Sequence, residues 1–197
     1  MEKPASAAYS IHPLIEKRWS PRAFQDRDVE VATLRRIFEA ARWAPSCFNE
    51  QPWRYIAVRR TDTDSFKRLL GCLTPNNQRW AGQAPVLVLS LASSAFAHNG
   101  KPNRHAFHDV GLASAMLTLE ATAAGLGVHQ MAGFDVDAAR KELVVPERFD
   151  PVAVLAVGYP GDPGQLPDDL QEKERAPRQR RGQEEFVFDG VWGDPLS

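Results

Sequence analysis

The sequence has few cysteines, no long uninterrupted apolar run and no excess of charge of either sign. Cys47 and Cys72 are the only cysteines among 197 residues, too few for a disulfide framework, so a reducing compartment is expected. No apolar stretch is long enough to cross a bilayer, and the first residues do not resemble a signal peptide. A net charge of −1 also lacks the basic excess of nucleic-acid binders. We therefore expect a cytoplasmic protein that binds neither membranes nor nucleic acid.

Several catalytic motifs are missing as well. Gly125 and Gly127 lack the third glycine of the dinucleotide-binding fingerprint, and they follow a predicted helix rather than a strand. The sequence contains no GxxxxGK[ST] phosphate loop, no GxSxG elbow and no CxxC pair. His105 and His108 could share one face of a helix, but neither a cysteine nor a third histidine lies near them in the sequence. Hydrolysis, thiol redox chemistry and a metal centre are therefore not indicated.

The patterns that are present predict one domain with a central sheet. Three runs rich in apolar and branched residues predict strands: 53–60, 85–92 and 152–160. Three segments with helical spacing or composition predict helices: 28–44, 64–72 and 107–125. The segment TPNNQRW, residues 74–80, is expected to be a loop. This alternation predicts an α/β or α+β domain.

Signals at the helix ends refine these predictions. Asp28 can cap the first helix, and Pro45 stops it, because proline donates no hydrogen bond and disfavours helical geometry at the residue before it. Gly125 is a plausible terminator of the helix over 107–125. Small residues occur on every face of that helix, so we expect it in the centre of the structure with close neighbours.

The C-terminal part departs from the alternating pattern. Residues 161–183 consist mainly of proline, glycine and charged residues, a composition that is typical of a flexible linker. The stretch EFVFDGVW, residues 185–192, then restores a strand-like apolar character. We interpret the whole as an arm that wraps another surface, such as a second subunit. The chain is accordingly divided into a core, 1–160, and a C-terminal arm of the same domain, 161–197.

Positive charge gathers in KRWSPRAF, residues 17–24. A solvated turn is the default interpretation, since exposure is the usual fate of lysine and arginine. The alternative is a clamp for an anion. Arg18, Ser20 and Arg22 could supply two planar guanidinium groups and a hydroxyl, and a guanidinium matches phosphate in a bidentate manner. Arg178, Arg180 and Arg181 place further cations near the C-terminus.

Two other segments carry groups suited to a heterocycle. The loop over 45–52 offers Ser46, Asn49 and Gln51, which both donate and accept hydrogen bonds. Residues 130–133 supply backbone amides together with a glycine that permits close approach. One set of segments thus carries groups that can bind phosphate, and another carries groups that both donate and accept hydrogen bonds. This combination indicates a nucleotide-like cofactor.

Taken together, these segments resemble the nitroreductase family of flavin enzymes, from about Leu14 to Trp192. The matching pieces occur in the family's order: RWSPRAF, APSCFNEQPW, NNQRW before APVLVL, GLGVHQMAGFD, AVGYP and the arginine-rich arm. The resemblance implies an α+β fold, a single domain whose central, mainly antiparallel sheet is surrounded by helices. It also implies a homodimer across which the C-terminal arm is exchanged.

The resemblance further implies FMN bound at the dimer interface, with NADH or NADPH as co-substrate. It assigns cofactor binding to these positions: Arg18, Ser20 and Arg22; Pro45, Ser46, Cys47 and Asn49 in a loop from the other subunit, with Gln51 close by; Asn77; Gln130, Met131, Ala132 and Gly133; and Arg178 and Arg180. Two features depart from the family pattern. The arm continues with Arg181-Gly182-Gln183 where a basic residue, Pro and Leu are common, and position 132 is Ala where some members carry an acid.

The implied function is a reductase that uses NAD(P)H to reduce nitroaromatics, quinones or similar electron-poor small molecules by ping-pong hydride transfer. Since the flavin carries this chemistry, no catalytic side chain is identified, and no metal is expected. Residues 93–104 and the arm after Gly161 are expected to shape the oxidant pocket. The alternatives are a flavin-dependent dehalogenase or biosynthetic oxidase of the same fold, or a non-catalytic flavin-binding or sensory protein.

Overall fold

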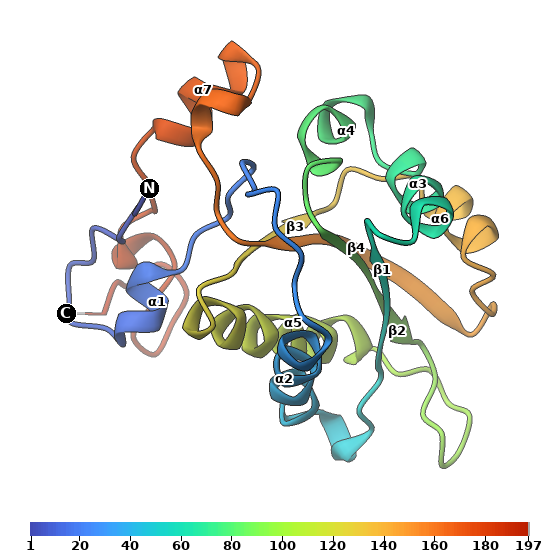
Figure 1. Ribbon diagram of the computed structural model, residues 1–197. Helices are drawn as coiled ribbons and strands as arrows, with labels where there is room; N and C mark the ends of the chain where they lie inside the picture. The colour runs from blue at the N-terminus through green and yellow to red at the C-terminus, as the bar shows by residue number, and fades with distance from the viewer. Residues whose placement is uncertain (197) are drawn as a thin grey trace.

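A four-stranded antiparallel sheet forms the centre of the computed structural model, which describes residues 1–196 (Figure 1). The last residue of the predicted arm, Ser197, lies outside the described residues. The strands are β1 (Trp53–Arg59), β2 (Val86–Ser93), β3 (Gly127–Met131) and β4 (Phe149–Gly158). Their order is β1-β2-β4-β3, and every neighbouring pair is antiparallel. The predicted α+β fold with a mainly antiparallel sheet is confirmed.

The apolar runs explain which strands lie in the middle. In β2, Leu87 and Leu89 pack into the hydrophobic cluster on one face of the sheet, and Val86 and Val88 pack into the cluster on the other. This alternation follows from the two-residue period of a strand, and it makes β2 apolar on both faces, as predicted. β3 is only five residues long, which is too short for its pattern to be recognised in the sequence.

Helices cover both faces of the sheet (Figure 1). One face is covered by α2 (Val31–Arg42) and α5 (Ala106–Ala123), which pack against each other. The other face carries α3 (Thr63–Gly71), α4 (Pro75–Ala81) and α6 (Val136–Glu142). Two hydrophobic clusters fill the spaces between the sheet and these layers. Burying one leucine or phenylalanine side chain in them contributes roughly 1.5–3 kcal/mol, so the two clusters supply most of the driving force for folding.

The small-residue helix α5 is buried on one side only. Its inner side includes Val110 and Leu117, which are fully buried, and Gly125 follows its end with a φ of +78°, as expected for a terminator. On its outer side, Phe107 and Met116 are 52% and 38% exposed. The sequence predicts a central position with close neighbours for this helix. In the single chain, one face of the helix is buried in this way and the other face is exposed to solvent.

The predictions for the start of α2 and for residues 74–80 are wrong. The N-cap of α2 is Glu30, whose side chain makes no capping hydrogen bond, so Asp28 does not cap this helix. The segment TPNNQRW forms α4 instead of a loop. Thr74 is its N-cap and Pro75 stands at its first turn, where the missing N–H of proline costs nothing and its fixed φ favours a helix.

The beginning of the arm packs against its own chain. Gly161 N–H donates to the carbonyl of Ala23 at 2.8 Å, and the Gln165 side chain donates to the carbonyl of Phe24 at 2.7 Å. Residues Asp168–Arg175 then form α7. Composition alone predicted a flexible linker here, but these contacts hold the segment on the N-terminal part of the same chain.

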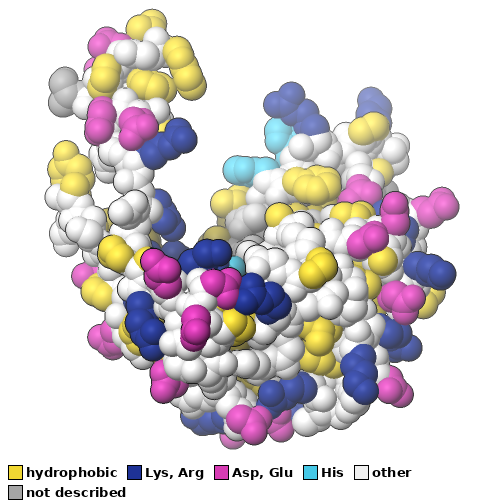
Figure 2. Space-filling view, turned by 90° about the horizontal axis from the view of Figure 1, so that it is seen from above, with side chains coloured by type: hydrophobic (Ala, Val, Ile, Leu, Met, Phe, Trp, Pro, Cys, Tyr) yellow, Lys and Arg dark blue, Asp and Glu magenta, His cyan; other side chains and the backbone are white. Residues whose placement is uncertain are grey.

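The end of the arm projects from the body (Figure 2). EFVFDGVW forms turns with one isolated bridge between Phe188 and Pro195, so its strand-like pattern does not produce a strand. Trp192 is 90% exposed, and Phe186 and Val191 are also exposed. None of the helices in the described part of the chain has the length and hydrophobicity that a bilayer-spanning helix needs.

Candidate functional site

A hollow of about 440 Å³ lies between α1 (Pro13–Lys17), the middle of α5 and strand β3. It contains polar side chains from three distant parts of the sequence: Arg18, Ser20, Gln130 and Arg180. Apolar side chains, among them Val128 and Leu119, form the rest of its lining. The volume lies in the range of small-molecule sites, and a largely apolar lining with a few convergent polar groups is typical of them.

The hollow is positively charged. Arg18 and Arg180 line it, and among the described residues no Asp or Glu does. Burial lowers the pKa of Arg18 from its ordinary value, and repulsion from Arg178 and Arg180 lowers this pKa further. Arginine nevertheless stays protonated in proteins. The site therefore holds partly desolvated positive charge that an anion would stabilise.

Two elements hold residues 17–24, here called the arginine-rich segment, in place from opposite sides. Glu174 of α7 is fully buried, and its Oε1 accepts the backbone N–H groups of Arg22 at 2.7 Å and Ala23 at 3.1 Å. On the other side, Pro21 packs on Gly127 of β3 so closely that a Cβ atom at position 127 would lie 2.3 Å from Pro21 Cγ. The arm helix and the sheet edge thus fix the backbone that carries Arg18 and Ser20.

Arg22 is placed differently from Arg18. Its Nη1 lies 3.6 Å from Glu174 Oε2, and it does not line the hollow. Glu174 Oε2 has no hydrogen-bond partner among the described residues. The positive charge of Arg22 is therefore the main interaction that stabilises the negative charge of this buried oxygen. The sequence groups Arg18 and Arg22 in one clamp, whereas the structure separates them; a contact between Arg22 and a flavin stays a prediction.

His129 is a site-adjacent residue that the sequence reading did not single out. Its ring packs on Trp80 at a centroid distance of 4.6 Å, and its Nδ1 donates to the carbonyl of Pro21 at 3.1 Å. Burial, followed by the nearby charge of Arg22, lowers the pKa of His129 to about 4. At neutral pH this histidine is therefore uncharged, and its hydrogen bond to Pro21 helps to fix the backbone of the arginine-rich segment.

The predicted Asn77 and Gly133 meet in the structure. Asn77 Nδ2 donates to the carbonyl of Gly133 at 3.0 Å, and a Cβ atom at Gly133 would lie only 2.8 Å from this amide nitrogen. Met131 is buried in the core and Ala132 is exposed, and neither lines the hollow. Glycine at position 133 is thus explained by the contact with α4.

The loop from Pro45 to Gln51 is strained. Phe48, Asn49 and Gln51 have φ angles of 53°, 57° and 51°, a left-handed conformation that is unfavourable for non-glycine residues. Such clusters concentrate at functional sites, where surrounding contacts maintain them. Here Asp109 of α5, a buried carboxylate, accepts the N–H of Cys47 at 3.0 Å. Neither the strain nor this partner is visible in the sequence.

This loop does not reach the hollow of its own chain. Asp109, which holds the loop, and Ala115, the nearest α5 residue that lines the hollow, both belong to α5. At 1.5 Å per residue, they are about 9 Å apart along the helix axis. One chain therefore gathers Arg18, Ser20, Gln130 and Arg180, while Pro45, Ser46, Cys47, Asn49 and Gln51 lie elsewhere.

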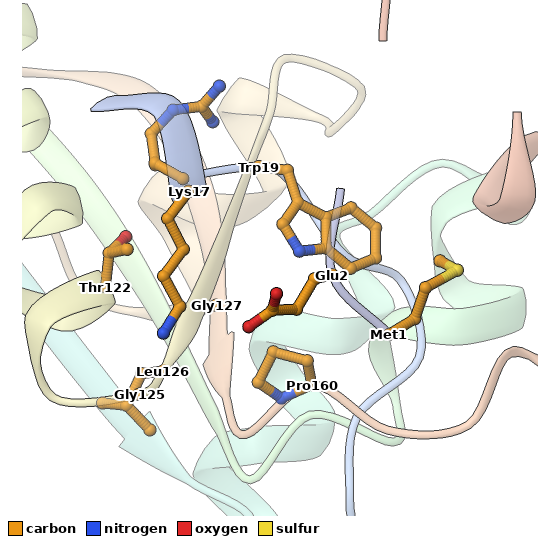
Figure 3. Close-up of a pocket in the computed structure, with 10 residues that line it drawn as sticks. Met1, Glu2, Lys17, Trp19, Thr122, Gly125, Leu126, Gly127 and Pro160 are labelled. Atoms are coloured by element: carbon orange, nitrogen blue, oxygen red, sulfur yellow. The ribbon is translucent and has the colours of Figure 1, made fainter. Parts of the chain in front are cut away.

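A second, smaller pocket of about 90 Å³ lies between Trp19 and the turn at Gly125–Gly127 (Figure 3). The side chains of Lys17 and Glu2 both point into it (Figure 3). Its volume is below the range of cofactor sites, and a carboxylate in its wall disfavours an anion. Within residues 1–196, no group of three His, Cys, Asp or Glu side chains is arranged to hold a metal. We therefore assign the candidate site to the hollow.

Comparisons with known proteins find similar sequences. The family model described as "Nitroreductase family" matches residues 15–72 and 66–159. An uncharacterized 15.4 kDa protein of Mycolicibacterium smegmatis is 37% identical over 150 residues, which covers 73% of this chain and 99% of that protein. An NADH dehydrogenase of Thermus thermophilus is 30% identical over 181 residues, 75% of this chain and 85% of the relative.

Solved structures show the same similarity. A crystal structure described as an oxidoreductase containing FMN matches with a TM-score of 0.90 and 33% identity, over 96% of both chains. A nitroreductase family protein from Clostridium difficile matches with a TM-score of 0.70 and 25% identity, over 90% of this chain and 96% of the other. The likeness to the first structure extends over nearly the whole chain.

Proposed function

Because this chain belongs to the nitroreductase family, we propose that it is an FMN-dependent oxidoreductase that uses NADH or NADPH to reduce small electron-poor compounds such as nitroaromatics and quinones. The observation that carries the proposal is the hollow in which Arg18, Ser20 and Arg180 meet Gln130 without a carboxylate. The overall similarity to an FMN-containing oxidoreductase supports it. A cytoplasmic location stays a prediction.

The donors in the hollow fit a flavin mononucleotide. Arg18 and Arg180 complement a phosphate group, whose charge at pH 7 is about −1.5 to −2. Ser20 can donate to a phosphate or ribityl oxygen, and the Gln130 amide can donate to and accept from a polar ring edge. Val128 and Leu119 offer apolar surface to a flat ring. These residues bind and orient the cofactor.

The bound flavin would supply the hydride chemistry, and the protein's contribution is binding, orientation and charge. No side chain in the hollow combines an acid or base with a suitably placed partner, which agrees with this division of labour. A single hollow offers one space to the hydride donor and to the oxidant. We therefore propose that the two substrates bind in turn, as ping-pong kinetics requires.

The decisive experiment identifies the chromophore and tests its turnover. The protein is expected to purify with FMN, which denaturation releases for identification. Under anaerobic conditions NADH or NADPH should bleach the flavin absorbance, and a quinone should restore it. FAD, or no flavin after reconstitution, contradicts the proposal; FMN that neither nicotinamide bleaches favours the flavin-binding sensor instead.

Replacing Arg18 by alanine is expected to weaken FMN binding by about tenfold to a hundredfold, because one charge-assisted hydrogen bond contributes roughly 1.5–3 kcal/mol. Arg18→Lys keeps the charge but loses the planar fork, so it should restore part of this affinity. Flavin fluorescence titration measures both.

Arg22→Ala is the matched comparison, because the Arg22 side chain contacts Glu174 instead of the hollow. It should lower the affinity less than Arg18→Ala does. The reverse order would mean that Arg22 leaves Glu174 and binds the flavin. Equal affinities for all variants and the parent would contradict the role of this segment.

We also propose that the functional unit is a homodimer in which each chain completes the other's site. In the single chain no residue of the loop with Asn49 and Gln51 lines the hollow, and Asp109, which holds the loop, lies about 9 Å along α5 from the nearest residue that does. Another copy of the chain could bring its own loop there. The exposed side of α5, with Phe107 and Met116, offers apolar surface for this contact, and Phe48 at the loop tip is 85% exposed. Exchange of the arm beyond Gly182 belongs to the same proposal.

Sedimentation at micromolar concentration is expected to show a dimer, since obligate interfaces commonly bury more than about 2,000 Å². Met116→Glu should shift the protein towards monomer and lower its FMN content, because the charge would be buried in the interface. Val136→Glu is the control: Val136 has similar exposure but lies on α6, away from α5. A folded parent monomer with bound flavin would rule the dimer out.

A further inference from the structure

A larger groove opens beside the hollow. It has a volume of about 500 Å³ and lies between residues 5–11 near the N-terminus and residues 178–186 of the arm. Ile15, Arg18 and Arg180 line both spaces, so the groove continues directly from the hollow. In the space-filling view, Lys and Arg side chains follow the notch between the projecting arm and the body (Figure 2).

The groove carries more positive charge than one flavin phosphate needs. Four arginines line it, and none of its lining residues, all in the described part of the chain, is acidic: Arg18, Arg178, Arg180 and Arg181. Burial, followed by repulsion from Arg180, lowers the pKa of Arg178 from its ordinary value. This concentration is local, because the whole chain has a net charge of −1.

The four arginines are not equivalent. Arg178 Nη1 donates to the backbone carbonyls of Lys3 at 3.0 Å and Glu16 at 2.7 Å, so it joins the arm to the N-terminal part of the chain and forms part of the groove wall. Arg18 and Arg180 also face the hollow and suffice for one phosphate. Arg181 remains: its side chain is 81% exposed, and Glu185 lies 3.9 Å away as a weak, exposed partner.

We propose that this groove binds a second phosphate-bearing group, the adenosine-phosphate end of NADPH. The inference rests on the proposed function, because a dinucleotide whose nicotinamide lies over a flavin in the hollow can extend into the groove. Tyr9, which is exposed, offers an aromatic face at the groove on which an adenine can stack. The guanidinium of Arg181 suits the 2′-phosphate that NADPH carries and NADH lacks.

The test uses protein saturated with FMN, so that the flavin phosphate already occupies its site. Calorimetric titration compares 2′,5′-ADP, 5′-AMP and inorganic phosphate. We expect 2′,5′-ADP to bind at least tenfold more tightly than either of the others. Arg181→Ala should weaken 2′,5′-ADP by about threefold to tenfold and raise the KM for NADPH more than that for NADH. Its FMN content should match that of the parent.

Arg175→Ala is the control, since Arg175 is an exposed arginine of the same arm that contacts Gln171 and does not line the groove. It should leave the affinity for 2′,5′-ADP unchanged. Equal binding of the three probes, or equal effects of the two substitutions, would overturn the inference. Failure of the parent to bind FMN would instead refute the proposed function, and the two results are distinguished by the flavin spectrum before any probe is added.

Discussion

Glu174→Ala is expected to lower the free energy of unfolding by about 3–5 kcal/mol, the range for removing one partner of a buried ion pair. The substitution leaves the buried backbone N–H group of Ala23 and the partly buried one of Arg22 without their acceptor, and each buried unsatisfied group costs roughly 1–3 kcal/mol. It also removes the charge that compensates Arg22. Urea unfolding of the flavin-free protein measures the loss.

Two variants separate the causes. Glu174→Gln keeps an oxygen that can accept both N–H groups, so it should lose less stability than Glu174→Ala. Asp169→Ala removes an exposed ion pair with Arg79 from the same helix, α7, and should cost under about 1 kcal/mol. If Glu174→Ala proves as mild as Asp169→Ala, the buried carboxylate does not hold the arginine-rich segment.

A second large effect is expected when the pH falls. The pKa of His129 is about 4 in the folded protein, compared with an ordinary value of 6.5. Between these values the unfolded chain binds a proton that the folded chain does not, so stability falls as the pH is lowered from 6.5 to 4. The full contribution is roughly 3 kcal/mol, at 1.36 kcal/mol per pKa unit.

The variant His129→Gln isolates this contribution. It loses the contact with Trp80, so its stability at pH 7 is expected to be lower than that of the parent. Its stability should nevertheless depend less steeply on pH between 6.5 and 4, because glutamine does not titrate. Urea unfolding at several pH values gives both slopes. Identical slopes would show that His129 is not the group that responds to acid.

The sheet was largely predictable because its central strands are recognisable from local composition. Runs such as PVLVLSLA need no knowledge of their neighbours to be assigned as buried strands. α4 was not predicted because Asn76 and Asn77 have low helix propensity, and the helix depends on its start at Thr74-Pro75 and on burial of Trp80. Local pattern thus predicts the elements whose own residues are strongly apolar.

The residue types of the candidate site were predictable from the sequence, but the contacts that each residue makes were not. Arg18, Ser20, Gln130 and Arg180 were grouped by their chemistry, and the structure brings them together. The same reasoning grouped Arg22 with them, because a sequence does not show that Glu174 lies beside it. Such pairings join residues far apart in the chain and depend on the whole fold.

The contact between Arg22 and Glu174 has a consequence for protein synthesis. The two residues are 152 positions apart, and translation proceeds at about 5–20 residues per second. Glu174 is therefore synthesised roughly 8–30 s after Arg22. During that time the segment emerges from the ribosome without the helix that fixes it. Cofactor loading is therefore expected to follow chain release, and ribosome-bound chains that end before α7 should not retain flavin.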